Sequence, residues 1–256
     1  MITAAQAGNT NATATWVGGV CPGATDNVDI HGFAIVQAGG ALTYASLVDL
    51  QGGGSFTATA AFTCLSVDNV GILFNTAGDI TLTLGGSFLR EAKGIEVGSS
   101  ATLLTLAFPN GFTNSGTGCG YGIYNSGTIE DITGSLINSG DGYGIYNTGI
   151  IEDISASVIN NGYVGIYNSH TIGDIIGSVI NSGSTGIYNI TGTIEDISGV
   201  VMGTDGTSYN GSLPATLTGS IVKSDPALLA SNIKQGVTML TLAGTFHVDI
   251  LGAGML

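Results

Sequence analysis

The chain has 256 residues, of which 43 are glycine and 43% are hydrophobic, and its formal net charge is −14. This hydrophobic content argues against a disordered chain, and no run approaches the roughly 18 consecutive apolar residues of a membrane-spanning helix. Between Gly94 and Val222 there are ten acidic residues and no Lys or Arg. Such a surface repels phosphate backbones, so we expect no nucleic-acid partner. Because there is no long apolar run, we also expect no membrane span.

Residues 1–70 are predicted to form an N-terminal β cap and the first, irregular rungs of a β structure. The stretch Thr15–Ile30 contains Trp16, the only tryptophan, followed by a Gly-Gly and a Pro-Gly turn. We expect this large aromatic side chain to plug the open end of the stack. Because Met1–Gly8 has neither a basic nor an apolar signal region, we expect either assembly inside a cell or a signal that was removed beforehand.

Residues 71–206 are predicted to form a parallel β-helix. A Gly-Ile-Tyr-Asn motif begins at Gly122, Gly144, Gly165 and Gly186, with spacings of 22, 21 and 21 residues. Segments of strand length, rich in Ile, Val, Thr and Tyr, lie between Asn-x-Gly corners, whose residues tolerate positive φ. A fixed period of this length indicates stacked units that share one core. We therefore expect an all-β, right-handed parallel β-helix with rungs of about 21 residues.

The repeat places equivalent residues in columns along the stack, and two columns of the motif are candidate sites. Neighbouring residues of a strand face opposite sides, so we expect Ile inward and Tyr outward; tyrosines that point inward would belong to the core. The Tyr column is a candidate contact surface for a glycan or another subunit: Tyr124, Tyr146, Tyr167 and Tyr188. The Asn column is expected to form a structural amide ladder: Asn125, Asn147, Asn168 and Asn189.

A further column is acidic and is a candidate cation ladder: Asp131, Asp153, Asp174 and Asp196. Carboxylates one rung apart repel one another, and Ca²⁺ could bridge them, although a solvated acidic face is the simpler interpretation. Beside it runs a Glu column that Gly173 interrupts. Glycoside hydrolysis needs one carboxylate pair with divergent pKa values, whereas every rung offers the same pair, so we expect no catalytic site. Apart from this Ca²⁺ hypothesis, no cofactor is expected.

The cysteine and histidine residues predict neither a disulfide framework, a metal cluster nor a catalytic triad, because they lie far apart. They are Cys21, Cys64, Cys119, His31, His170 and His247. His170 stands where other copies of the repeat have a corner glycine, and we expect it to adopt the left-handed conformation.

Residues 207–256 are predicted to form a C-terminal assembly module. Ser224–Gly236 reads as one short helix, with Pro226 at the first helical position and a glycine at its end, between two glycine-rich β stretches. The final segment, Val248–Leu256, is apolar for a chain terminus, and we expect it to dock on this chain or a neighbour.

Three stretches resemble known families. Trp16–Ile30 follows the pattern W-x-G-G-x-x-P-G-x-x-D-x-V-x-I, which resembles the openings of many β-helical proteins of phages and bacterial surfaces. The repeats resemble the Gly-Ile-Tyr-Asn-Ser-Gly-Thr-Ile arrays of bacterial surface adhesins and autotransporter passengers. Residues 207–256 resemble a small module of tailed-phage fibre and virion proteins.

These resemblances imply a non-enzymatic virion structural protein: a phage tail-fibre, spike or capsid-decoration subunit, assembled in the host cytoplasm. The implied partners are further copies of the chain, in a trimer by similarity to phage spikes, together with other virion proteins and cell-surface polysaccharide. One alternative is a bacterial surface adhesin or extracellular filament subunit, found outside the cell. Another is a polysaccharide-degrading tailspike.

Overall fold

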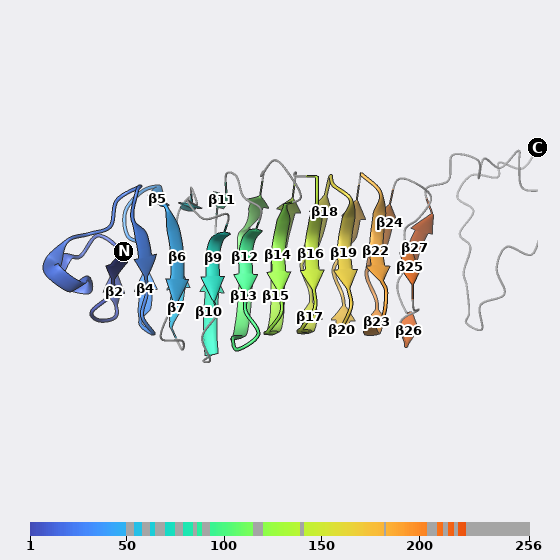
Figure 1. Ribbon diagram of the computed structural model, residues 1–256. Helices are drawn as coiled ribbons and strands as arrows, with labels where there is room; N and C mark the ends of the chain where they lie inside the picture. Colours follow the sequence, from blue (N-terminus) through green and yellow to red (C-terminus); the bar gives the residue numbers. More distant parts are fainter. Residues whose placement is uncertain are drawn as a thin grey trace, which may run out of the picture.

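A computed structural model describes the chain at residues 1–49, 54–57, 62–64, 70–74, 79–83, 86–88, 93–114, 120–138, 141–181, 183–203, 209–211, 215–217 and 220–223. In these residues the chain is almost entirely β, and its parallel strands stack into a solenoid (Figure 1). The predicted parallel β-helix is therefore confirmed, while its right-handed sense stays a prediction. The helical segments of this part are two short 3-10 turns, η1 (Thr13–Thr15) and η2 (Val17–Gly19). No helix within it is long and apolar enough to cross a membrane.

The strands line three faces of the solenoid, which appear as three rows in Figure 1. The first face consists of β1 (Ile2–Thr3), β3 (Asn27–Asp29), β6 (Ser46–Asp49), β9 (Val70–Phe74), β12 (Lys93–Val97), β14 (Tyr121–Asn125), β16 (Tyr143–Asn147), β19 (Val164–Asn168), β22 (Thr185–Asn189) and β25 (Tyr209–Gly211). The second face consists of β2 (Gly8–Asn9), β4 (Ala34–Val36), β7 (Ser55–Thr57), β10 (Asp79–Thr83), β13 (Thr102–Asn114), β15 (Thr128–Asn138), β17 (Ile150–Ile154), β20 (Thr171–Ile175), β23 (Thr193–Ile197) and β26 (Thr216–Leu217).

The third face begins with short strands and continues with the last residues of two long ones. It consists of β5 (Leu42–Tyr44), β8 (Phe62–Cys64), β11 (Gly86–Phe88), the ends of β13 and β15, β18 (Ser157–Asn160), β21 (Val179–Asn181), β24 (Val200–Gly203) and β27 (Ser220–Lys223). Both β13 and β15 run around the corner from the second face to the third, and Gly134, with φ +92°, lies at this bend of β15. Only glycine adopts that φ without strain.

The core is a set of apolar columns that run the length of the stack. Ile123 pairs with Ile145, which pairs with Ile166, and each of these side chains is fully buried. The second and third faces contribute equivalent buried columns, among them the one through Ile132 and Ile154 and the one through Leu136 and Val158. Each fully buried side chain of this size contributes about 1.5–3 kcal/mol relative to an exposed one, so the repeat of buried residues stabilises every turn.

The N-terminal residues close one end of the solenoid. Trp16 is only 2% exposed, belongs to the same buried cluster as Ala4 and Val28, and donates its indole N–H to the Thr10 carbonyl at 3.0 Å. Figure 1 shows this blue segment beyond the first strands. A buried aromatic ring with a satisfied N–H is what an end plug requires, because the first rung would otherwise expose its interior to water.

At the other end the stacking continues beyond residue 206. β25 pairs with β22, β26 with β23, and β27 with β24, so each face gains another strand after the last Gly-Ile-Tyr-Asn motif. The division of the chain at residues 70 and 206 stays a prediction. The predicted helix at 224–236 and the apolar end at 248–256 lie outside the described residues.

The glycines at the Asn-x-Gly corners were predicted to adopt positive φ, but in the structure they allow successive turns to approach closely. Among the described residues, the only non-glycine residue with positive φ is His31, so the left-handed conformation predicted for His170 is wrong. The corner glycines Gly127 and Gly149 likewise do not have a positive φ. A Cβ at Gly149 would overlap the carbonyl oxygen of Gly127 in the preceding turn. Gly127 and Gly149 are needed because a carbonyl oxygen of the preceding turn lies where a Cβ would stand. At the equivalent corner of the third copy the side chain of His170 is accommodated in an exposed position.

We therefore predict that Gly149→Ala destabilises the solenoid by roughly 1–3 kcal/mol, because the added methyl group forces two turns apart. Urea unfolding followed by far-UV circular dichroism measures this change. Gly40→Ala is the matched control, since a Cβ at that exposed glycine meets no atom within 4 Å. Equal stability of the two variants would show that the close approach at the corner does not require glycine.

Candidate functional site

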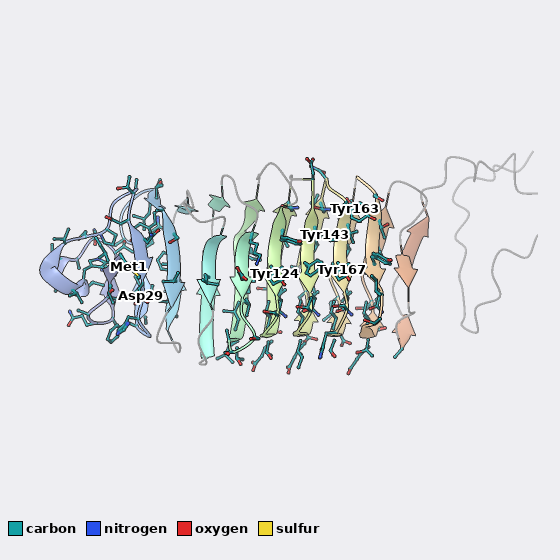
Figure 2. All side chains as sticks on the ribbon, viewed as in Figure 1. Met1, Asp29, Tyr124, Tyr143, Tyr163 and Tyr167 are labelled. Atoms are coloured by element: carbon teal, nitrogen blue, oxygen red, sulfur yellow. The ribbon has the colours of Figure 1, made fainter. Side chains whose placement is uncertain are left out.

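Six tyrosines of the first face and one at its corner with the third face form a continuous aromatic cluster, here called the tyrosine surface. Its members are Tyr121, Tyr124, Tyr143, Tyr146, Tyr163, Tyr167 and Tyr188. In β14, β16, β19 and β22 the motif Ile is buried and the following Tyr is half-exposed. The four predicted column tyrosines therefore point away from the core, as Figure 2 shows for Tyr124 and Tyr167.

The tyrosine rings stack on one another along the solenoid axis. The ring centroids of Tyr124 and Tyr146 are 5.4 Å apart with an interplanar angle of 6°, and those of Tyr146 and Tyr167 are 4.4 Å apart and parallel. Equivalent positions on hydrogen-bonded strands lie about 4.8 Å apart, so identical side chains in the same rotamer have parallel rings and can stack. Tyr188 ends the stack with an edge-on contact to Tyr167, at 5.8 Å and 86°.

A second, shorter stack of tyrosines lies beside the first. Tyr121 stacks on Tyr143 at 5.3 Å and 9°, and Tyr143 meets Tyr146 edge-on at 5.1 Å and 80°. Tyr163 meets Tyr143 edge-on at 5.9 Å. The sequence did contain a signal for this stack, because Tyr121 and Tyr143 each stand two residues before the motif Ile.

The stacking determines what the tyrosine surface offers to a ligand. A sugar ring packs on an exposed aromatic face, but the two faces of Tyr146 lie against Tyr124 and Tyr167. At the start of the column the Lys93 ammonium lies 4.0 Å from the centre of the Tyr124 ring. At Tyr124 and Tyr146 the ring edges and hydroxyl groups are therefore what remains for contact, which at these two residues favours packing and hydrogen bonding over stacking on a sugar.

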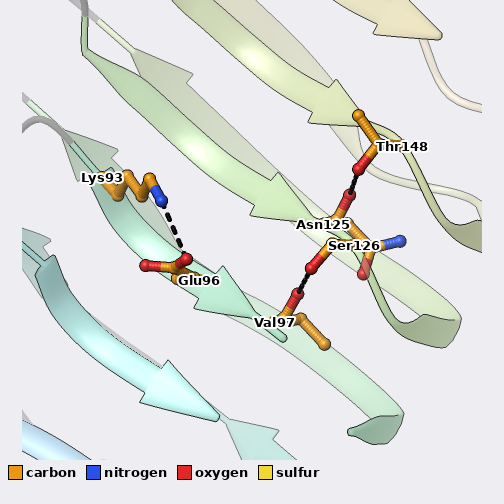
Figure 3. A network of polar contacts seen from close by, with 6 residues as sticks. All are labelled: Lys93, Glu96, Val97, Asn125, Ser126 and Thr148. Carbon is orange, nitrogen blue, oxygen red and sulfur yellow. Dashed lines mark hydrogen bonds and ion pairs between the residues drawn. The ribbon is translucent and has the colours of Figure 1, made fainter. Parts of the chain in front are cut away.

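The tyrosine surface begins next to a charged pair. Lys93 and Glu96 form an ion pair of 2.8 Å on β12, and they occupy the positions that Tyr121 and Tyr124 occupy one turn later (Figure 3). A partly exposed pair of this kind contributes at most about 1 kcal/mol. The following first-face strands β14, β16, β19 and β22 contain no charged residue.

Burial raises the pKa of the Tyr146 phenol from 10.0 to about 12, and Tyr167 adds to this through charge repulsion and a side-chain hydrogen bond. The folded chain thus holds this proton more tightly than the unfolded chain does. Above an unfolded-state pKa of about 10 the unfolded chain releases a proton that the folded chain keeps, so stability falls as pH rises from about 10 to about 12.

We predict that Tyr146→Phe loses less stability than the unchanged protein between about pH 10 and about pH 12, because it lacks this proton. Urea unfolding at a series of pH values measures the difference. Tyr163→Phe is the control, because Tyr163 is 57% exposed in the same cluster, and it should behave like the unchanged protein. Identical pH profiles for Tyr146→Phe and the unchanged protein would show that the Tyr146 phenol does not cause the loss of stability at high pH.

The predicted asparagine column forms a ladder of side-chain amides inside the corner between the first and second faces. Asn125 Nδ2 donates to Asn147 Oδ1 at 2.8 Å, Asn147 to Asn168 at 2.8 Å, and Asn168 to Asn189 at 3.0 Å. All four side chains are fully buried. Each amide also serves its own corner: Asn147 Oδ1 accepts the Gly149 N–H and Asn147 Nδ2 donates to the Gly149 carbonyl. A buried amide is tolerated because these bonds satisfy it.

Hydroxyl groups cover the outer side of the same corner. Ser126 donates to the Val97 carbonyl and Thr148 to the Asn125 carbonyl, each at 3.1 Å (Figure 3). The bonded carbonyls each lie one turn earlier in the stack. Amides inside and hydroxyls outside therefore join successive turns at this corner.

A second amide ladder, not identified in the sequence, lies in the corner between the third and first faces. Asn138 Nδ2 donates to Asn160 Oδ1 at 2.8 Å, and Asn160 donates to Asn181 at 3.3 Å. All three side chains are buried. The recurrence of an Ile-Asn pair at 21- to 22-residue spacing was its signal, but these residues were interpreted only as turn formers.

We predict that Asn147→Ala destabilises the protein by about 2 kcal/mol or more, because it leaves buried partners of the ladder without hydrogen bonds. Thermal and urea unfolding measure the loss. Asn11→Ala makes the same chemical change at an exposed turn and should be nearly neutral. A small effect at Asn147 would mean that water replaces the amide in the corner.

The acidic columns lie on the second face, on β15, β17, β20 and β23. The register pairs Asp131 with Asp153, Asp153 with Asp174, and Asp174 with Asp196. These aspartates are half-exposed or exposed. Within the described ranges no three His, Cys, Asp or Glu side chains are grouped so that they could hold a metal ion.

The missing glutamate at Gly173 leaves a shallow groove of about 330 Å³ on this face. Its lining residues are Ile150, Ile151, Glu152, Asp153, Thr171, Gly173, Asp174 and Glu195. This rung differs from its neighbours because Gly173 replaces a glutamate, so the rung has one carboxylate fewer rather than a distinct catalytic pair. The carboxylates of the groove occupy the same repeating positions as those of the other rungs, and no basic residue lines it.

The remaining candidate residues are separate from these surfaces. His31 Nδ1 lies 3.0 Å from Asp29 Oδ2 at the N-terminal end of the molecule, and Cys21 is a half-buried free thiol. The side chains of Cys64, Cys119 and His247 lie outside the described residues.

The fold and its surfaces define a parallel β-solenoid with a tyrosine surface on one face and carboxylates on another. Comparison with protein-family models, with curated proteins and with solved structures finds no match for this chain.

Proposed function

We propose that the protein is a non-enzymatic structural rod of a virion: a phage tail-fibre, spike or capsid-decoration subunit. The observation that carries this proposal is the repetition of the same residues in turn after turn. The amide ladders, isoleucine columns and tyrosine stacks occupy equivalent positions on successive strands, as expected of a stiff spacer whose surface repeats along its length.

The distribution of titratable groups supports a role without catalysis. Acid–base catalysis needs a pair of groups in different environments, whereas the carboxylates of the second face recur in register from β15 to β23. The groove at Gly173 is lined by side chains of this same series. The resemblance of Trp16–Ile30 and of residues 207–256 to phage proteins supports the virion over other settings for the rod.

Within this function the tyrosine surface is the contact region. It presents ring edges and hydroxyl groups over several turns without a charged residue on those strands, and such aromatic surfaces are typical of protein interfaces. Recognition of a host glycan by this surface would proceed through the phenol hydroxyls.

The bacterial adhesin remains a second candidate because the Gly-Ile-Tyr-Asn-Ser-Gly-Thr-Ile arrays resemble adhesin repeats. An adhesin and a virion rod need the same stiffness, so the location of the protein distinguishes them.

We predict that antibodies raised against the purified chain label phage particles released by the source culture, and not the cells before release. Immunogold electron microscopy of purified particles and of intact cells measures this. An antibody adsorbed with the purified chain is the control. Labelling of the envelope of cells that release no particles would replace the virion proposal with the adhesin.

The purified chain also tests the third candidate, a polysaccharide-degrading tailspike. Capsular and lipopolysaccharide preparations from the host, incubated with the purified chain, should release no new reducing ends. Release that is abolished by Asp174→Asn would show that the groove at Gly173 is catalytic and would overturn the non-enzymatic proposal.

A further inference from the structure

The outward side of the third face carries an isoleucine column beside a column of serines. In β18, Val158 and Asn160 are buried while Ser157 and Ile159 face outward. One turn later Ile180 is 38% exposed, and beyond it Val200 is 37% exposed. A sheet face that water covers normally carries polar residues, and parallel sheets are usually covered on both faces. The outward isoleucines Ile159 and Ile180 in successive turns therefore indicate a face that is covered in the assembled protein.

This apolar region continues around a corner onto the tyrosine surface. The chain passes from β18 on the third face to β19 on the first face through Tyr163, whose side chain is 57% exposed. The Tyr163 ring meets the Tyr143 ring edge-on at 5.9 Å, and Figure 2 shows Tyr163 above Tyr143, toward the row of third-face strands. The name apolar edge is used here for Ile159, Ile180, Val200, Tyr163, Tyr143 and Tyr167.

The charges of the same turns lie elsewhere. Between β14 and β24 the described acidic residues are on the second face, except Asp141, which stands at the corner one turn before Tyr163. The second-face set consists of Glu130, Asp131, Glu152, Asp153, Asp174, Glu195 and Asp196. Within one Debye length, about 8 Å at physiological ionic strength, these carboxylates repel any other acidic surface.

We propose that the apolar edge is the docking surface for a second copy of this chain, with the rods side by side and their acidic faces turned toward solvent. The proposal rests on the structural-rod function and identifies the surface through which such rods associate. A copy with a net charge of −14 meets repulsion at the second face, whereas the strands of the apolar edge carry no charge.

The spacing of the side chains also favours a second copy over an unrelated partner. Outward isoleucines and tyrosines recur once per turn, at the strand spacing of about 4.8 Å. Another rod of this sequence has the same spacing, so each of its ridges meets a groove of the first over several turns. A cationic partner would instead bind the acidic face. A sugar would need exposed ring faces, and the two faces of Tyr146 are covered by the neighbouring rings.

The test is the mass of the full chain in solution, by light scattering across a concentration series, for the unchanged protein and two variants. Ile180→Lys places a charge at the centre of the apolar edge. Ile150→Lys is the matched control, because it makes the same change at a residue that is 37% exposed but lies on the second face. Circular dichroism and thermal unfolding establish that both variants are folded.

We expect the unchanged chain to form a multiple of 25.6 kDa and Ile150→Lys to keep it, while Ile180→Lys raises the dissociation constant about tenfold or more. Tyr163→Glu, at a more exposed position, should have the same effect without risk to the core. A monomeric unchanged chain, or an oligomer that both edge variants leave intact, would overturn the proposal; the latter result would place the contact between copies on another surface.

The outcome is separable from that of the virion proposal. Immunogold labelling of particles together with a monomeric chain would reject only the apolar edge as a self-contact. Self-association that Ile180→Lys weakens, in a protein absent from particles, would reject the virion setting and keep the docking surface.

Discussion

Each turn of the solenoid lies about 4.8 Å from the next, at the spacing of hydrogen-bonded parallel strands, and the rest of the structure depends on this distance. It brings every side chain into contact with its equivalent in the next turn. Isoleucine tolerates such contact by packing on itself, as the buried column through Ile123 and Ile145 shows. Asparagine tolerates it because an amide both donates and accepts, so Asn125 and Asn147 satisfy each other inside the core.

The same distance is unfavourable for carboxylates, which repel at this separation. The aspartates from Asp131 to Asp196 accordingly lie at exposed or half-exposed positions of the second face, where water screens them. A tyrosine column can lie inside the core or on the surface, and here the rings stack outside the core on the first face. One geometric constraint thus separates the surface into aromatic, acidic and apolar faces. This separation is the basis for inferring a rod that contacts its partners through its uncharged faces.

The fold and part of the candidate site were predictable because the period is strict. A residue such as Tyr146 or Asn147 has the same surroundings as its equivalents 21 or 22 residues away, so alternation along one strand sufficed to place Tyr outward and Ile inward. The corner glycines were misinterpreted, because a glycine permits both positive φ and close approach. At Gly149 the reason is the carbonyl of Gly127, an atom that only the neighbouring turn supplies.

By itself the sequence determined which residues of the repeats share a column, because copies of one motif at spacings of 21 or 22 residues allow only one register. It did not determine how the columns are arranged around the axis. The second amide ladder through Asn160 and the contact between Tyr143 and Tyr163 both depend on where the chain turns its corners. Those turns are set by close packing between successive rungs, which no residue specifies alone, so only the tertiary structure decided them.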